Sequence, residues 1–278
     1  MARGSSRRRS EPTASAAGQN DHVDEVPLIG GNFGASVRIG DTVHRRAGPW
    51  TPAVHALLAH LRRVGFGAVP EPLGMDEQGR AVLSFMPGDV HAGWPDPLPQ
   101  WMFEDELTLV AAADLLRRYH DSLEGFVPLP GARWRFVAPG AHEVICHNDW
   151  SPSNALFRGH TPVGMLDWDS AGPGTRAWDV ALSVYSWVPL KPRVTRPNLA
   201  AKASRFALFC DAYGDGIARR EVFDTLTAQL LVYADFIQAE ADAGDPGFAK
   251  LAGWNVPADL RNDSAALVQQ QGLLFGSS

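Results

Sequence analysis

The 278-residue chain is predicted to fold as an α+β protein of two lobes. The first lobe would be a small antiparallel β-sheet with one helix, and the second would be larger and mainly α-helical. Short runs of alternating apolar and polar residues occur between residues 26 and 85, whereas longer segments with apolar residues at helical spacing follow residue 104. A stretch rich in proline and glycine, residues 86–99, separates the two patterns and marks the lobe boundary.

Composition divides the chain into three parts. Residues 1–22 are rich in Ser, Arg, Ala and Gly without periodicity, so we expect a disordered basic tail. Residues 23–88 should form the small lobe, with a hinge at residues 84–88. Residues 89–278 should form the helical lobe.

The overall composition is that of an ordinary globular protein, with 45% hydrophobic and 20% charged residues. A net charge of -6 argues against nucleic acid as a partner, because nucleic-acid binders usually present a basic face. No run approaches the ~18 continuous apolar residues of a membrane span, and the arginines at 7–9 lack the apolar segment of a secretory signal. Cys146 and Cys210 form no disulfide framework. We therefore expect a cytoplasmic monomer or homodimer without a membrane partner.

The elements of the small lobe follow from local patterns. The predicted strands are residues 26–29, 35–39, 42–46, 69–73 and 81–85. Gly40-Asp41 joins the second and third of them as a two-residue hairpin turn. Thr51 is the predicted N-cap and Pro52 the first residue of a helix that ends before Gly65.

A glycine-rich loop follows the first predicted strand, with Gly30, Gly31 and Gly34. Glycine lets backbone amides approach a phosphate without obstruction from a Cβ atom. A plain β-turn has the same composition, so the phosphate-binding interpretation depends on motifs further along the chain.

Five segments predict the helices of the large lobe: residues 104–124, 175–187, 197–213, 219–243 and 257–274. In the first, acids precede Arg117, Arg118 and His120, in agreement with the helix dipole.

The segment that organises the chain is residues 144–179. An apolar run leads into His147 and Asp149, Asn154 follows five residues after Asp149, and Asp167 comes after a second apolar run. A proton acceptor, an amide and a carboxylate at this spacing are the groups that phosphoryl transfer needs. One group accepts the proton of the attacking hydroxyl, and hard oxygen atoms hold magnesium on the nucleotide phosphates.

These motifs resemble those of the protein-kinase-like superfamily, and more closely those of its aminoglycoside phosphotransferase and choline kinase branch. There the catalytic loop typically reads His-Gly-Asp-Leu-His-Pro-Gly-Asn; residues 147–154 read His-Asn-Asp-Trp-Ser-Pro-Ser-Asn. The metal strand, typically Ile-Asp-Trp/Phe-Asp/Glu, is Leu-Asp-Trp-Asp at 166–169, and the trailing Asp-Leu-Ala is Asp-Val-Ala at 179–181. The resemblance extends over roughly residues 26–236 and implies a bilobal protein-kinase-like fold.

The resemblance implies a role for each motif residue. Asp149 would be the catalytic base, although an Asp in a loop can also simply cap its own backbone. Asn154 and Asp167 would bind Mg²⁺. Asp169 would be a further metal ligand or an acid behind the metal, with a solvated turn residue as the alternative. His147 would complete the catalytic loop by bracing it with hydrogen bonds.

The small lobe departs from the family pattern. The family pairs a strand lysine with a helix glutamate to hold the phosphates, whereas residues 42–46 contain no lysine and the helix at 52–63 contains no acid. Strand alternation places Val43 and Arg45 on one face, and the apolar residue of the pair should pack on the adenine. Arg45 is therefore the predicted phosphate contact, with Arg46 in reserve, and Val54 or His55 stands where the acid is expected.

The resemblance also implies how the rest of the cofactor and the acceptor would bind. Phe85 and Met86 in the hinge would present backbone groups to the purine of ATP or GTP. Asp179 would support the catalytic loop from a helix start, or merely cap that helix. Trp150, with Trp94 and Trp101, is a candidate for shaping an apolar acceptor pocket. Acids after residue 197 could receive cationic groups of an acceptor, but solvated helix faces have the same composition.

Two functions of different class follow. The first is a Mg²⁺-dependent phosphotransferase that moves the γ-phosphate of a nucleoside triphosphate to a hydroxyl of a small molecule. The second is a kinase-like nucleotide-binding or regulatory protein without turnover, which the missing Lys–Glu pair favours. A metal-dependent hydrolase built on His147, Asp149 and Asp167 is disfavoured, because the sequence offers no further cluster to complete a metal shell.

Overall fold

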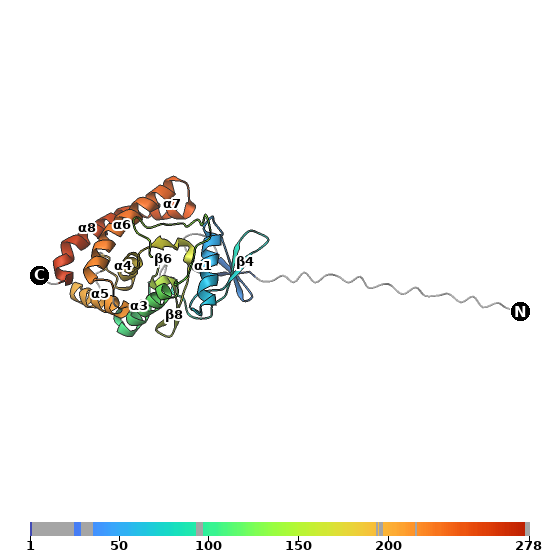
Figure 1. Ribbon diagram of the computed structural model, residues 1–278, viewed down its shortest axis with the longest axis horizontal. Helices are drawn as coiled ribbons and strands as arrows, with labels where there is room; N and C mark the ends of the chain where they lie inside the picture. The colour runs from blue at the N-terminus through green and yellow to red at the C-terminus, as the bar shows by residue number, and fades with distance from the viewer. Residues whose placement is uncertain are drawn as a thin grey trace.

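A computed structural model describes Met1 and residues 25–28, 36–92, 97–192, 194, 197–214 and 216–275. The predicted tail from residue 2 onward and the glycine loop with Gly30, Gly31 and Gly34 lie outside the described residues. Figure 1 shows α1 and β4 of the small lobe at one end of the molecule and helices α3 to α8 at the other.

The predicted strands and helices occur in the predicted order, and further short elements lie between them. They are β1 (Val26–Leu28), β2 (Ser36–Ile39), β3 (Thr42–Arg45), α1 (Thr51–Arg63), β4 (Pro72–Met75), β5 (Ala81–Ser84), α2 (Trp101–Glu104), α3 (Glu106–Asp121), β6 (Val144–Cys146), η1 (Pro152–Asn154), β7 (Ala155–Arg158), β8 (Thr161–Met165), η2 (Trp168–Ser170), β9 (Gly172–Gly174), α4 (Arg176–Trp187), α5 (Leu199–Tyr213), α6 (Arg219–Asp242), α7 (Pro246–Gly253) and α8 (Val256–Phe275). The predicted α+β class is confirmed.

The small sheet has strand order β1-β2-β3-β5-β4, and neighbouring strands are antiparallel. Ile39 pairs with Thr42, so the predicted two-residue hairpin forms, and Gly40 adopts φ 58° in its turn. The central strand β3 carries Arg45 opposite Ala81 of β5.

The large lobe is a helical assembly that encloses two short β-ribbons. Helix α6 packs against α4, α7 and α8, and α3 packs against α5. The ribbons β6–β9 and β7–β8 hold the loops that carry the candidate site residues. Among the described residues, no helix is both long and apolar enough to cross a membrane.

Some predicted boundaries were wrong by one to several residues. Thr51 is the first residue of α1 rather than its N-cap, because Trp50 takes that position and the Thr51 hydroxyl accepts from the Gly48 amide. The strand expected at 69–73 is found at Pro72–Met75. Helices α2 and α7 were not predicted. Both are short, and in α7 the signals are an Asp–Pro start at Asp245 and one buried aromatic residue.

Gly172 provides a test of how the core positions the loop that begins at His147. It pairs with Cys146, the residue before His147, and a Cβ atom at Gly172 would overlap the carbonyl group of Phe136. We expect Gly172→Ala to lower the free energy of unfolding by about 1–3 kcal/mol, because backbone has to move. Thermal and urea unfolding measure this. In the control Gly253→Ala the new methyl group meets no atom within 4 Å, so stability should be unchanged or slightly higher. Equal stability of the two variants would contradict this account.

Candidate active site

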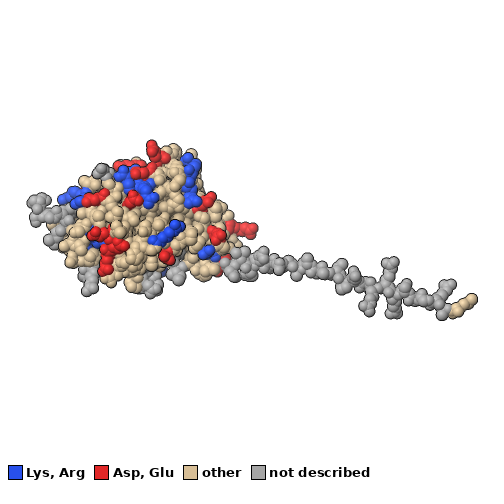
Figure 2. All heavy atoms as spheres, turned by 90° about the horizontal axis from the view of Figure 1, so that it is seen from below, with Lys and Arg blue, Asp and Glu red and all other residues tan. Residues whose placement is uncertain are grey.

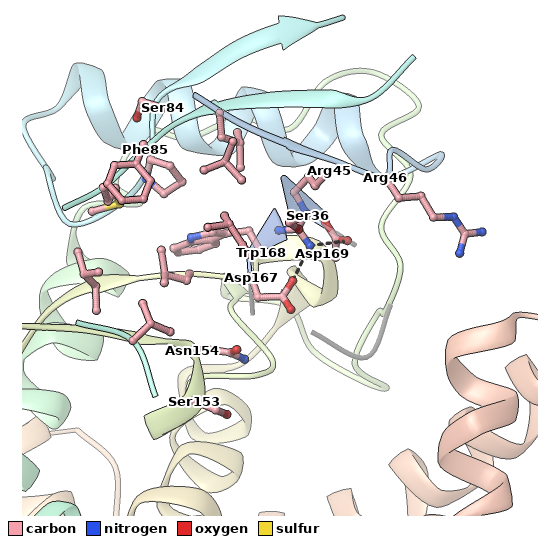
Figure 3. Close-up of a pocket in the computed structure, with 18 residues that line it drawn as sticks. Ser36, Arg45, Arg46, Ser84, Phe85, Ser153, Asn154, Asp167, Trp168 and Asp169 are labelled. Atoms are coloured by element: carbon pink, nitrogen blue, oxygen red, sulfur yellow. Dashed lines mark hydrogen bonds and ion pairs between the residues drawn. The ribbon is translucent and has the colours of Figure 1, made fainter. Parts of the chain in front are cut away.

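Six predicted site residues of the described chain line one cavity between the lobes, with a volume of about 240 Å³, whereas His147 and Asp149 do not line it. Arg45, Phe85, Met86, Asn154, Asp167 and Asp169 all line it. Figure 3 shows Asp167, Asp169 and Asn154 below the sheet, with Arg45 reaching down from β3. The cavity therefore joins residues more than 120 positions apart in the sequence, as the hydrogen bond from Arg45 to Asp167 shows.

The apolar end of the cavity lies beside the hinge. Its walls include Leu28, Val43, Leu83, Leu156 and Leu166. The Arg38 guanidinium stacks 3.7 Å above the Phe85 ring, which fixes that side chain at the cavity edge. As strand alternation predicts, Val43 and Arg45 face the cavity, whereas the His44 ring turns to Asp76 at 2.7 Å.

The loop that carries Asp149 is held by a buried carboxylate. Asp179, inside α4, accepts hydrogen bonds from the amides of His147 at 2.7 Å and Asn148 at 2.9 Å. Asp179 does not cap α4, because Thr175 does. Asn148 adopts φ 63°, a conformation that asparagine tolerates well. It stands where the family loop has glycine.

Asp179 of α4 belongs to a hydrogen-bonded chain that continues through His120 of α3 to Tyr213 of α5. His120 Nε2 lies 3.0 Å from the Asp179 carboxylate, and His120 Nδ1 lies 2.8 Å from the Tyr213 hydroxyl. Burial would raise the pKa of Asp179, but the hydrogen bond from His120 and the amide contacts hold it below the usual carboxyl range. Asp179 therefore stays ionised and keeps the loop in place.

His147 braces the loop from the inside. Its Nε2 lies 3.0 Å from the Leu166 carbonyl, which can only accept, and its Nδ1 accepts from the Asp149 amide at 3.3 Å. These two contacts specify the neutral tautomer with the proton on Nε2. Burial lowers the pKa of His147, in agreement with a neutral ring. With no exposed surface, His147 is a positioning residue for Asp149 and for the start of the Asp167 turn.

Asp149 and Asn154 form a pair at the cavity mouth. Asn154 Nδ2 donates to Asp149 Oδ2 at 2.7 Å and to the Asp149 carbonyl at 2.9 Å. This orientation turns Asn154 Oδ1 away from the carboxylate, where it can serve as a ligand. Desolvation by the surrounding protein raises the pKa of Asp149 to about 7, and the negative charge of Asp167 adds to the rise. The residue nevertheless keeps an exposed surface. A carboxylate with this pKa suits proton transfer near neutral pH.

Arg45 bridges the two acids Asp167 and Asp169. Its Nη2 atom lies 2.7 Å from Asp167 Oδ1 and 2.9 Å from Asp169 Oδ2, as the dashed lines of Figure 3 indicate. Burial opposes the charge, but the two carboxylates hold the pKa of Arg45 above its usual value. Burial raises the pKa of Asp169, whereas the charge of Arg45 outweighs burial at Asp167 and lowers its pKa.

The side-chain oxygen atoms in the cavity suit a hard divalent cation that is also bound by the phosphates of a nucleotide. Asn154 and Asp167 offer an amide and a carboxylate oxygen on the same cavity wall, and Mg²⁺ bound with phosphates commonly takes one or two protein oxygens and completes its shell with phosphate and water. Among the described residues, no group of three His, Cys, Asp or Glu side chains is arranged to hold a metal alone.

A second connection between the lobes was not predicted. Arg135 packs between aromatic rings, 4.4 Å from the centroid of Trp50 and 4.8 Å from that of Phe248. Its Nη2 lies 3.3 Å from Asp245 Oδ2, and Arg46 Nη1 lies 4.0 Å from the same oxygen. Trp50 and Arg46 belong to the small lobe and the others to the large lobe, so this Arg135 junction ties α7 to the small lobe.

Of the tryptophans suggested to shape an acceptor pocket, Trp150 does not fit that role. Trp150 is fully buried and its indole NH donates to the Ala112 carbonyl at 3.0 Å, so it is a core residue and the idea that it shapes a pocket was wrong. Trp101 stacks on His160 with ring centroids 4.2 Å apart, and Trp94 lies outside the described residues.

Three of the acids after residue 197 form surface ion pairs. Asp211, Asp224 and Asp235 pair with Arg219, Arg220 and Arg261. Figure 2 shows basic and acidic side chains intermixed over the face it presents. These contacts favour the interpretation as solvated helix faces.

Comparison with known proteins agrees with this geometry. A model of the phosphotransferase enzyme family matches residues 129–221, which include Asp149, Asn154, Asp167 and Asp179. The trifolitoxin immunity protein of Rhizobium leguminosarum bv. trifolii is 35% identical over 208 residues, 69% of this chain and 74% of that protein.

Solved structures share the fold. The crystal structure of a choline/ethanolamine kinase family protein from Mesorhizobium loti superposes with a TM-score of 0.61 at 16% identity, covering 92% of each chain. Amicoumacin kinase hAmiN, in complex with AMP-PNP, Ca²⁺ and Ami, superposes with a TM-score of 0.54 at 13% identity, covering 93% of this chain and 90% of that chain. The predicted kinase-like fold is thereby confirmed, and the chain belongs to the phosphotransferase enzyme family.

Proposed function

We propose that this protein is a Mg²⁺-dependent small-molecule kinase, which transfers the γ-phosphate of ATP or GTP to a hydroxyl group. The observation that carries the proposal is the convergence of Arg45, Asn154 and Asp167 at one interlobe cavity, with Asp149 outside its lining but hydrogen-bonded to Asn154. The cytoplasm, where nucleoside triphosphates are abundant, is the proposed location.

Each residue then has a defined task. Asp149 accepts the proton of the acceptor hydroxyl while the hydroxyl oxygen forms a bond to the γ-phosphorus and the bond to the nucleoside diphosphate breaks. Asn154 and Asp167 would hold the metal, which neutralises phosphate charge when bound. Arg45 contributes a second positive charge from above, and the Phe85–Met86 backbone receives the purine. Gly30, Gly31 and Gly34 remain the proposed phosphate loop.

The acceptor is proposed only as a class. The named relatives include an immunity protein against trifolitoxin, a choline/ethanolamine kinase family member and an amicoumacin kinase. A hydroxyl-bearing antimicrobial compound or an amino alcohol is therefore the acceptor class to test first. Phosphorylation of an antimicrobial compound would give a direct route to immunity.

The test measures nucleoside diphosphate release and acceptor mass with ATP and with GTP. The panel should contain amino alcohols, aminoglycosides, macrolides and hydroxyl-bearing antimicrobial peptides. We expect one class to raise turnover and gain the mass of a phosphate group, and EDTA should return turnover to background until Mg²⁺ is restored, because the phosphates lose their counter-charge. If nucleotide binds but no acceptor raises turnover above that of Asp149→Asn, the alternative without turnover is preferred; its favouring observation is the absence of an acid in α1.

A further inference from the structure

Arg45 lacks the partner that a phosphate-binding cation of this fold normally has. Helix α1 packs against β4 and η2, but it carries no Asp or Glu. In α1, His55 is the residue that interacts electrostatically with Arg45. Burial and the charge of Arg45 lower its pKa. A neutral imidazole cannot neutralise a guanidinium, so α1 supplies no counter-charge.

The counter-charge comes from the large lobe instead. Among the described residues, Arg45 donates hydrogen bonds to two groups, Asp167 and Asp169, both through Nη2. Each of the three side chains is less than one-third exposed, so water screens their attraction only partly.

The two acids are not equivalent. Asp167 lies on the wall shared with Asn154 and has an exposed fraction of 28%, whereas Asp169 is more enclosed, at 16%. Asp169 lies in η2, which packs against α1, and the turn is anchored because the Trp168 indole donates to the Met165 carbonyl at 3.0 Å. Asp167 can therefore turn to a metal while Asp169 keeps its contact with Arg45.

We infer that Asp169 is the positioning residue for Arg45: it replaces, from the large lobe, the helix glutamate that α1 lacks, and holds the guanidinium toward the nucleotide phosphates. This inference rests on the proposed function. It assigns Asp169 to the phosphate clamp and leaves Asn154 and Asp167 as the protein ligands of the metal.

The first test is a double-mutant cycle on nucleotide affinity, measured by calorimetry with Mg²⁺ and a non-hydrolysable ATP analogue. Asp169→Asn should weaken binding about tenfold, and Arg45→Ala at least as much. The double variant should bind no more weakly than Arg45→Ala, because the acid acts through the arginine. Additive losses would overturn the inference.

The second test separates a clamp from a metal ligand. Mn²⁺ affinity in the presence of the analogue, measured by electron paramagnetic resonance, should fall strongly in Asp167→Asn. After correction for nucleotide occupancy it should change less than twofold in Asp169→Asn. Loss of Mn²⁺ affinity equal to that of Asp167→Asn would overturn the inference and make Asp169 a metal ligand.

A rescue variant completes the design. His55→Glu places a carboxylate on α1 beside Arg45, so in the Asp169→Asn background it should restore at least half of the lost affinity, with folding checked by circular dichroism. Failure of rescue in a folded variant would count against the counter-charge role. If the natural chain binds no nucleotide at all, the proposed function itself fails; if it binds and Asp169→Asn binds equally well, only this inference fails.

Discussion

Replacing Asp149 with asparagine should lower the rate of phosphate transfer by about 10²- to 10⁴-fold, the usual contribution of a general base. Asparagine can still accept the hydrogen bond from Asn154 but cannot take the proton of the acceptor. Nucleotide affinity should stay within about twofold, because Asp149 is not among the residues that line the cavity. Single-turnover rates and calorimetry measure the two quantities separately.

The control for this prediction is Asp114→Asn. Asp114 is an exposed acid of α3 that, in the described part of the chain, forms an ion pair with Arg118 at the surface, at 2.8 Å. Its replacement should leave both the rate and the affinity unchanged. A rate for Asp149→Asn close to that of the natural chain, under conditions where chemistry limits turnover, would remove Asp149 from the role of base.

Replacing Asp179 with alanine should destabilise the protein by about 3–5 kcal/mol, because it leaves the buried amides of His147 and Asn148 and the His120 ring without an acceptor. A fall in Tm of about 10 °C or more is expected. Asp179→Asn keeps one oxygen acceptor and should lose less. Scanning calorimetry measures both variants.

The same carboxylate predicts a pH dependence with a definite sign. Its pKa is depressed in the folded state, so its contribution to stability is present above the ordinary carboxyl pKa of about 4 and is lost as pH falls through the lower folded value. The stability gap between the natural chain and Asp179→Asn should therefore narrow below about pH 4. A gap that stayed constant down to pH 2 would show that the carboxylate charge does not matter.

The sequence was most informative where chemistry and local structure coincide. The loop from His147 to Asn154 could be recognised because it matches the family motif at a fixed spacing, and the structure shows Asn154 in contact with Asp149. The hairpin at Gly40-Asp41 and helix α4 could be assigned because turn and cap chemistry are local.

Contacts between distant segments could not be predicted in the same way. Strand alternation placed Arg45 on the cavity face, but its partners follow only from how the sheet sits over η2. The contacts of Arg135 could not be predicted from the sequence, because its aromatic neighbours Trp50 and Phe248 are 85 and 113 positions away. Trp150 was misjudged because position beside a base does not reveal which way an indole points.

The Arg135 junction has a consequence for how the lobes can move. The hinge at Phe85 and the junction at Arg46 lie on opposite sides of the cavity in Figure 3. The junction adds to other contacts between the lobes, among them the bridge from Arg45 to Asp167 and Asp169 and the hydrogen bond from the Met165 amide to the Ala68 carbonyl at 2.8 Å. Opening of the cleft would therefore have to stretch the Arg135 junction as well as these contacts. Because Asp245 and Phe248 at α7 form part of the Arg135 junction, a displacement of α7 would also act on Arg46 and Trp50 of the small lobe.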